Sequence, residues 1–306
     1  MMHPANSTTP VTHFILLGFP SLGRQSRPLL CALLSLAYAA TVVGNFCSQG
    51  AVQGEGPSGA AGGNEGCETA RVPTNPTAPR MLCDLLHPGL PISFHACFLQ
   101  FYFFFSTGAT ECLFLAAMGL DRYLAICQPL RYPVLMSPPL CWTLVASCWL
   151  VGFLWFIAPI GLISRLSFCS PDTLDHFVCD PGPLLAASCS PAHWAGQFCA
   201  NMASLMLFTT ISFILASYGL VLRAVLRLPS GAGRHKAFST CTSHLVIVGL
   251  YYGSVMVNYA IPTASGTSGK VVTLFYTVGT PLLNPLIYSL RNKEMKEALR
   301  RTLLGE

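Results

Sequence analysis

Long apolar runs alternate with short polar segments along most of this chain of 306 residues. Each run is close to the roughly 20 residues that an α-helix needs to cross the hydrocarbon core of a bilayer. Runs of this length predict membrane-spanning helices rather than buried helices of a soluble domain. Six segments fit this description: 29–46, 94–127, 140–162, 198–222, 236–261 and 271–290.

The pattern breaks between the first run and the second. Residues 47–80 are rich in Gly, Pro, Ala and Thr, carry several charges, and contain no apolar window long enough to cross a bilayer. Such a composition buries too little apolar surface to offset the entropy lost on ordering. We therefore expect no crossing here. An authentic flexible loop and a passage translated in a shifted reading frame both fit this stretch.

Composition agrees with an integral membrane protein. Only 9% of the residues are charged and 52% are hydrophobic, with a mean hydropathy of +0.54, whereas a soluble domain carries about 25% charged residues. The net charge is +5, and clusters of Lys and Arg follow alternate runs, at 122–131, 223–236 and 291–301. The positive-inside rule makes these clusters cytoplasmic. Basic clusters separated by apolar runs do not form a nucleic-acid-binding face, so no nucleic-acid partner is expected.

Three charged residues lie in or at the end of the 94–127 run. Asp121 and Arg122 are adjacent where the run meets water, and an unpaired charge there would be costly, so we expect both to engage partners. An ordinary helix end with a snorkelling arginine is the alternative. Glu111 lies in mid-run, where a carboxylate is usually paired.

Four of the fourteen cysteines differ from the rest, which lie mostly within apolar runs. Cys97 is near the start of the 94–127 run, and Cys169, Cys179 and Cys189 are ten residues apart in a polar segment on the non-cytoplasmic side. Oxidation is possible there, and four cysteines allow three pairings. Metal binding with nearby histidines is the alternative. No CxxC or HxxxH spacing supports it, so we expect no metal ion and no cofactor.

Four motifs identify a family when they occur in this order and spacing. Residues 118–127 read Met-Gly-Leu-Asp-Arg-Tyr-Leu-Ala-Ile-Cys, and Ser217-Tyr218 follows in a later run. Residues 236–245 read Lys-Ala-Phe-Ser-Thr-Cys-Thr-Ser-His-Leu, and 281–293 contain Asn284-Pro285-x-x-Tyr288. Together they resemble the olfactory receptors, which are rhodopsin-like G-protein-coupled receptors. The resemblance covers residues 10–46 and 81–304 and fails across 47–80, where the family has its second span.

The resemblance implies an all-α membrane protein, a rhodopsin-like seven-helix bundle in which the second helix is absent or disordered. It also selects the disulfides Cys97–Cys179 and Cys169–Cys189 from the possible pairings. The predicted organisation is a tail (1–28), a first span (29–46), an aberrant Gly/Pro-rich segment in place of the second span (47–93), a five-span bundle (94–290), and a C-terminal amphipathic helix with a tail (291–306).

The same resemblance implies a receptor of the plasma membrane that binds a small volatile odorant and activates a heterotrimeric G protein of the stimulatory type. Arg122 would engage the G protein, with Asp121 restraining it at rest. Tyr218 and Tyr288 would rearrange around Arg122, although tyrosines also serve as plain anchors at a membrane interface. The predicted switch residues are Asp121, Arg122, Tyr123, Tyr218 and Tyr288.

The ligand site is expected between the upper halves of the helices, where small-molecule pockets form in bundles. Side chains at helical spacing on several runs suit such a site, although a stripe of this kind is more often helix packing. Few charges line it, so weakly polar ligands fit better than amines or phosphates. The predicted ligand-binding residues are Phe104, Phe105, Gly108, Cys112, Met202, Met206, Val255, Tyr259 and Thr277.

Three other readings compete with a signalling receptor. No metal-ligand spacing, Ser/His/Asp arrangement or phosphate loop points to an enzyme, and His244 is interpreted as an ordinary polar residue of a span. A small-molecule transporter would typically show internal repeats, and none is visible. The third alternative is a non-signalling, misassembled, pseudogene-like receptor product that is retained in the endoplasmic reticulum.

Counting crossings predicts the orientation of the first span. If residues 47–80 do not cross, the first span must run opposite to the family's orientation, with a cytoplasmic tail, and Arg24 and Arg27 before it agree with this. The glycosylation acceptor Asn6-Ser7-Thr8 would then stay unmodified. A first span that fails to insert, or a forced crossing by the Gly/Pro-rich segment, are the alternatives.

Overall fold

The structure is a computed structural model that describes residues 11–19, 23, 25–53, 77–169, 172–227, 232–260 and 267–279. Predictions on Asn6, Tyr288, residues 291–306 and most of the 47–80 segment fall outside the described residues. The side chain of Tyr259 is also outside the described part of the structure.

Three described helical segments are long and apolar enough to cross a bilayer. They are α4 (Phe94–Cys127), α6 continued by α7 (Pro138–Trp155 and Ile157–Ser164), and α9 (His193–Leu226). Shorter apolar stretches, Ser26–Val42 and Cys241–Val257, lie within α1 (Ser26–Gln53) and α10 (Ala232–Ala260). The remaining described helices are α3 (Ala78–Leu86), α5 (Tyr132–Leu135), α8 (Pro181–Ala186), α11 (Thr267–Leu274) and the π-helix η2 (Phe275–Gly279).

Local chemistry accounts for where the long helices begin and break. Ser93 caps α4, because its hydroxyl accepts from the backbone N–H of Ala96 at 3.3 Å. Two prolines open α6, at positions where a helix has no backbone acceptor for an N–H in any case. Pro159 lies near the break between α6 and α7, and a proline removes one hydrogen bond of the preceding turn.

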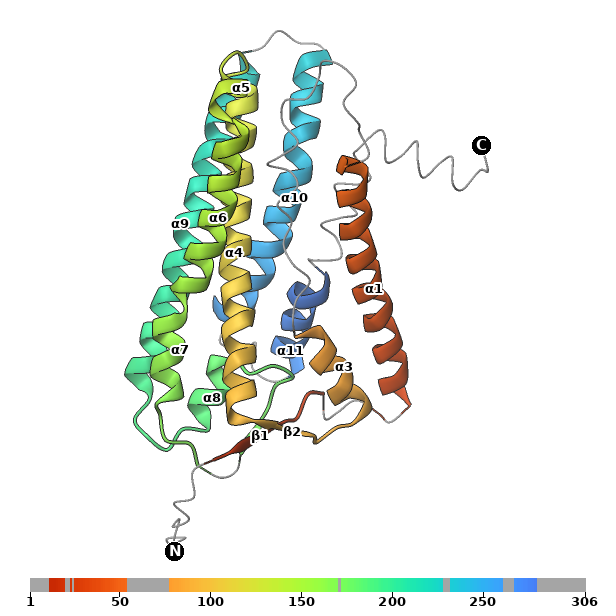
Figure 1. The fold of residues 1–306 in the computed structure, drawn as a ribbon, viewed down its shortest axis with the longest axis vertical. Coiled ribbons are helices and arrows are strands. Elements are labelled where there is room, and N and C mark those ends of the chain that lie inside the picture. The colour runs from red at the N-terminus through yellow and green to blue at the C-terminus, as the bar shows by residue number, and fades with distance from the viewer. Residues whose placement is uncertain are drawn as a thin grey trace, which may run out of the picture.

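Helix α4 is the centre of the bundle (Figure 1). It packs against α9, α6, α7 and α10. One buried cluster joins α4, α7, α9 and α10, and the half-buried Trp155 of α6 packs against it. Phe101 and Cys112 represent α4 in that cluster, with Met206 and Ile214 from α9 and Ile247 from α10. The central run of the sequence therefore supplies the helix on which the other spans assemble.

The segment 47–93 differs from its predicted description in its second half. From Ala78 the chain forms α3, whose Met81 and Leu85 are buried against Leu34 of α1 and against Phe177 and Val178. Apolar residues four apart lie on one face of a helix, and a neighbouring apolar surface makes even a nine-residue helix favourable. A helix of this length does not span a bilayer.

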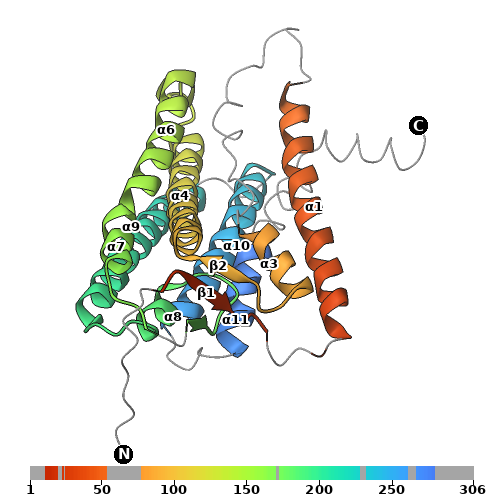
Figure 2. The ribbon, with the colours of Figure 1, turned by 60° about the horizontal axis from the view of Figure 1, so that its bottom comes forward.

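A small sheet at one end of the bundle was not predicted (Figure 2). Strand β1 (His13–Leu16) pairs antiparallel with β2 (Pro91–Ser93) and parallel with β3 (Thr173–Leu174). The Ile15 amide also donates to the Asp172 carbonyl at 2.9 Å. The segment before α1 therefore lies at the same end as the polar segment with the disulfides.

This placement is the reverse of the orientation that the crossing count predicts. Ser26 begins α1 at the end that carries β1, while α5, which follows Arg122, lies at the opposite end (Figure 1). Backbone hydrogen bonds of β1 to two other segments decide the position of the N-terminal region, and a count of apolar runs contains no information about such pairing.

Candidate functional site

Asp121, near the C-terminal end of α4, has two partners among the described residues. Its Oδ2 is 3.4 Å from Nε of Arg122, and its Oδ1 accepts from the hydroxyl of Tyr132 at 2.6 Å. Tyr132 is the first residue of α5, so the bond ties the connection after α4 back to the helix. The carboxylate is buried, with a side-chain exposure of 9%, and a charge-assisted hydrogen bond in such a place is strong. The expected engagement of Asp121 is thus present, with Tyr132 as a partner that the sequence did not reveal.

Tyr218 and His244 form a second polar contact in the same half of the bundle. The Tyr218 hydroxyl lies 2.7 Å from Nδ1 of His244, and the two rings are stacked. The His244 ring also faces α4, because a Cβ added to Gly119 would lie 4.0 Å from its Cε1. Tyr123 is half-buried and packs against the same core. His244 is therefore a polar residue of a span, and its contact is a predicted switch residue, Tyr218.

Several predicted ligand-site residues meet in mid-bundle. The hydroxyl of Tyr251 on α10 donates to the Gly108 carbonyl at 2.8 Å and accepts from Sγ of Cys112 at 3.5 Å. Tyr252 donates to Thr210 on α9 at 2.7 Å. These bonds join three helices at one level of the bundle. Sequence reasoning missed Tyr251 and Thr210, and no local pattern distinguishes them from other polar residues of a span.

Of the predicted ligand residues, the buried apolar cluster contains Cys112, Met206 and Val255, with Phe105 packed against it. Phe104 is buried on α4, and the Thr277 side chain is buried on η2. Met202 is half-buried, and its carbonyl accepts from the indole N–H of Trp155 at 3.0 Å. The described residues of the set thus lie on the four elements α4, α9, α10 and η2.

Two disulfides shape the polar segment at the other end. Cys97 is bonded to Cys179, and Cys169 to Cys189, with Cα–Cα distances of 5.6 Å in both cases. These are the pairs that the resemblance implies. The first bond fastens residues 172–180, hereafter the loop, to the start of α4.

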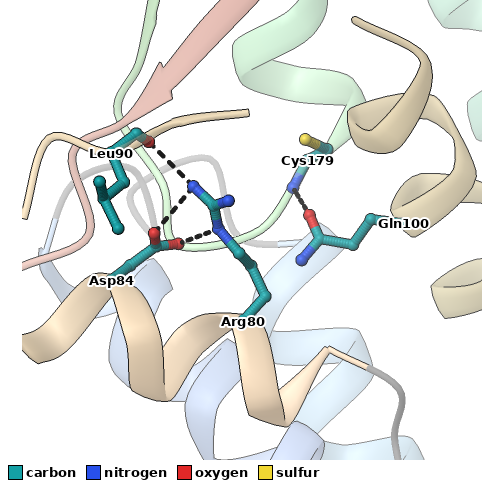
Figure 3. Close-up of polar contacts among 5 residues, drawn as sticks. All are labelled: Arg80, Asp84, Leu90, Gln100 and Cys179. Atoms are coloured by element: carbon teal, nitrogen blue, oxygen red, sulfur yellow. Dashed lines mark hydrogen bonds and ion pairs between the residues drawn. The ribbon is translucent and has the colours of Figure 1, made fainter. Parts of the chain in front are cut away.

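The loop makes further polar contacts with the helices beneath it. Its Cys179 amide donates to Oε1 of Gln100 on α4 at 3.1 Å (Figure 3). Its Asp175 pairs with Lys270 on α11 at 2.5 Å, where the ammonium is almost fully buried and the carboxylate is exposed. Burial lowers the pKa of His176, which follows Asp175 in the loop. The nearby Lys270 charge lowers this pKa further, whereas the carboxylates of Asp180 and Asp175 oppose the shift.

A short ion pair lies beside this region on α3. Arg80 contacts both carboxylate oxygens of Asp84, at 3.0 and 2.9 Å, and donates to the Leu90 carbonyl at 2.8 Å (Figure 3). These bonds hold the chain that leads from α3 into β2.

A comparison with known proteins gives the family. The family model described as olfactory receptor matches residues 71–306. Olfactory receptor 11G2 of Homo sapiens is 50% identical over 304 residues, which cover 97% of this chain and 87% of that protein. The chain belongs to the olfactory receptor family. Olfactory receptor 11H4 of Homo sapiens is 49% identical, over 99% of this chain and 96% of that protein.

The fold is that of the rhodopsin-like receptors, as predicted. The crystal structure of squid rhodopsin superimposes with a TM-score of 0.65 at 17% identity, over 92% of this chain and 81% of that one. The olfactory receptor family and this fold are those of multi-pass membrane receptors rather than of enzymes. The family match begins at residue 71, inside the stretch where the sequence departs from the resemblance.

Glu111 is the charged residue in the middle of α4 in this olfactory receptor chain. Among the residues that the structure describes, no hydrogen bond or ion pair reaches its carboxyl group, although the side chain is only half-buried. The described residues also contain no group of three His, Cys, Asp or Glu that could hold a metal ion.

Proposed function

We propose that the chain is an odorant receptor of the plasma membrane, which binds small volatile ligands within the helix bundle and activates a stimulatory G protein. The observation that carries the proposal is the closed arrangement at the cytoplasmic end: Asp121 pairs with Arg122 and is held by Tyr132. Close by, the hydroxyl of Tyr218 lies 2.7 Å from Nδ1 of His244. An arginine paired with its neighbouring carboxylate supports the proposal of a receptor at rest.

The mechanism is a population shift between two helix arrangements. A ligand that contacts α4, α9 and α10 together favours the arrangement in which these contacts are better. The bonds of Tyr251 and Tyr252 join the same three helices. A small rotation of α10 at these residues would therefore also move His244, which lies on the same helix. Arg122 leaves Asp121 and docks the G protein.

Ligand-evoked cAMP in cells that express the full chain tests this proposal. Arg122→Ala should abolish the response while surface staining stays unchanged, since the side chain docks a partner rather than filling the core. Arg223→Ala, at an exposed position near the end of α9, is the matched control. A normal response of Arg122→Ala would refute the role assigned to this arginine.

The second candidate is a receptor product that does not signal. Support for it comes from the family match, which begins only at residue 71, and from the nine-residue α3 as the sole described helix between α1 and α4. Surface staining separates the two candidates: intracellular retention of nearly all molecules, without any cAMP response, would favour the second.

A further inference from the structure

The side-chain amide of Gln100 has a fixed orientation. Its Oε1 accepts from the backbone N–H of Cys179, which is held in place by the disulfide to Cys97, one turn earlier on the same helix. An amide turned the other way would set an NH₂ group against this N–H, donor against donor. The nitrogen of Gln100 therefore points away from the loop backbone, as Figure 3 shows.

That nitrogen is a buried donor without an acceptor. Nε2 of Gln100 is inaccessible to solvent and has no hydrogen-bond partner in the described part of the chain. A buried donor without an acceptor loses its hydrogen bonds to water and gains none in exchange, which costs free energy. Such unsatisfied donors are rare in folded proteins. An acceptor on a bound molecule would satisfy this donor.

Gln100 lies at the loop end of the predicted ligand face of α4. Phe104 and Gly108 follow it at intervals of four residues, so the three share one side of the helix. The row is about 12 Å long at 1.5 Å per residue. Tyr251 closes its far end through the bond to the Gly108 carbonyl. Gln100 is thus the polar end of an otherwise apolar row.

A second polar group beneath the loop, the Lys270 ammonium, also offers hydrogens rather than lone pairs. The buried Lys270 ammonium has three N–H groups, and Asp175 is its one bonded partner among the described residues. The same ion pair neutralises the charge of Lys270, so a ligand carboxylate would have to displace Asp175. A neutral acceptor does not meet this competition.

Resting on the proposed odorant-receptor function, we propose that Gln100 selects ligands with a carbonyl group. Its amide nitrogen donates to the carbonyl oxygen of a ketone, aldehyde or ester, while the carbon chain lies along Phe104 toward Gly108.

Paired probes test this selection through cAMP concentration–response curves of the full chain. The pairs are medium-chain methyl ketones and the matching 2-methyl-1-alkenes, in which a =CH₂ group replaces the carbonyl oxygen. Gln100→Glu keeps an oxygen for the Cys179 amide but removes the N–H donors, and Gln100→Met removes both. Gln197→Met is the control, because Gln197 is an exposed glutamine whose amide nitrogen donates to Asn201 at 2.9 Å.

We expect the unmodified chain and Gln197→Met to prefer ketones, and both Gln100 variants to need about tenfold more ketone at unchanged surface level and alkene response. Equal potency of ketone and alkene on the unmodified chain, or unchanged ketone potency in Gln100→Glu, overturns the inference and leaves the proposed function intact. A chain that responds to other odorant classes but not to ketones also overturns the inference and leaves the proposed function intact. A chain that responds to no member of a broad odorant panel refutes the proposed function, and the inference with it.

Discussion

Asp121 is a carboxylate with two partners of different kinds at the cytoplasmic end of α4. Arg122 is an adjacent residue whose release the proposed mechanism requires, whereas Tyr132 belongs to the short helix α5 and is not part of the sequence motif. The tyrosine keeps the carboxylate oriented while it pairs with the arginine. In the proposed mechanism, a hydroxyl outside the motif therefore contributes to the resting state.

Tyr132→Phe should raise ligand-independent cAMP, because the Asp121 carboxylate loses the hydroxyl that donates to it and restrains Arg122 less well. A hydrogen bond to a charged group contributes about 1.5–3 kcal/mol, so the resting population should fall by roughly tenfold or more relative to the active one. The measurement is basal cAMP normalised to surface level. Tyr102→Phe is the control, since its hydroxyl donates to the Phe153 carbonyl between α4 and α6, away from the switch. An equal basal signal in both variants would contradict the assignment.

His176 makes the stability of the loop depend on pH. Its pKa in the folded state is lowered, first by burial, so the folded chain favours the neutral ring. At a pH above the pKa that His176 has in the unfolded chain, the ring is neutral in both states, and the folded chain has its full stability. As the pH falls through that value, the unfolded chain binds a proton that the folded chain resists, and stability is lost.

We therefore expect the melting temperature of the purified chain to fall more between pH 7.5 and pH 5.5 than that of His176→Asn. The asparagine oxygen can still accept from the Val178 amide, as Nδ1 of His176 does at 3.2 Å, but it does not titrate. His193→Asn, at an exposed position on α9, should behave like the unmodified chain. Parallel pH curves for the unmodified chain and His176→Asn would exclude His176 as the source.

At the scale of elements, the crossing of α4 and α6 depends on one small residue. A Cβ added to Gly152 would lie 2.9 Å from the backbone nitrogen and 3.0 Å from Cα of Thr110. Backbone atoms cannot rotate away as a side chain does, so the helices would have to separate. Small residues commonly permit such close approach between membrane helices.

Gly152→Ala should lower the stability of the purified chain by about 1–3 kcal/mol, the usual cost of overpacking a well-packed contact. Thermal unfolding in detergent measures the effect. In Gly249→Ala on α10 the new Cβ meets no atom within 4 Å, and alanine is the better helix former by about 1 kcal/mol. That control should be as stable as the unmodified chain or more so. A Gly152→Ala variant that is equally stable would show that the helices do not approach so closely.

At the scale of the whole molecule, β1 decides on which side of the membrane the chain begins. Its pairing with β2 and β3 places residues 13–16 beside the disulfide-bonded loop, on the non-cytoplasmic side. Asn6 lies seven residues before β1, outside the described residues. The fold therefore predicts the family's orientation for the first span, opposite to the orientation from the count of crossings.

We expect the expressed chain to carry a glycan at Asn6. A glycosidase should increase its electrophoretic mobility, and Asn6→Gln should abolish that shift. Asn45→Gln, within α1, serves as the control and should leave the shift intact. A chain whose mobility does not respond to glycosidase would favour the inverted orientation, with the N-terminal segment in the cytoplasm.

The pattern along the sequence was sufficient for the features that depend on local composition. Apolar runs predicted α4, α6 with α7, and α9, because crossing a bilayer demands a length and a hydropathy that can be read without a partner. The low apolar content of residues 47–80 marked the stretch in which the family match begins. The motif residues Asp121, Arg122 and Tyr218 identified the family, which the comparisons confirm.

Only the tertiary structure decided which residues meet. Tyr132 and Asp121, His244 and Tyr218, Tyr251 and Cys112, and Gln100 and Cys179 are bonded across separations of 11 to 139 residues. Periodicity indicates that such residues face the interior, but the rotation and crossing of the helices determine their partners. The orientation of α1 was decided in the same way, since it follows from backbone pairing between β1, β2 and β3, segments too short to leave a pattern in the sequence.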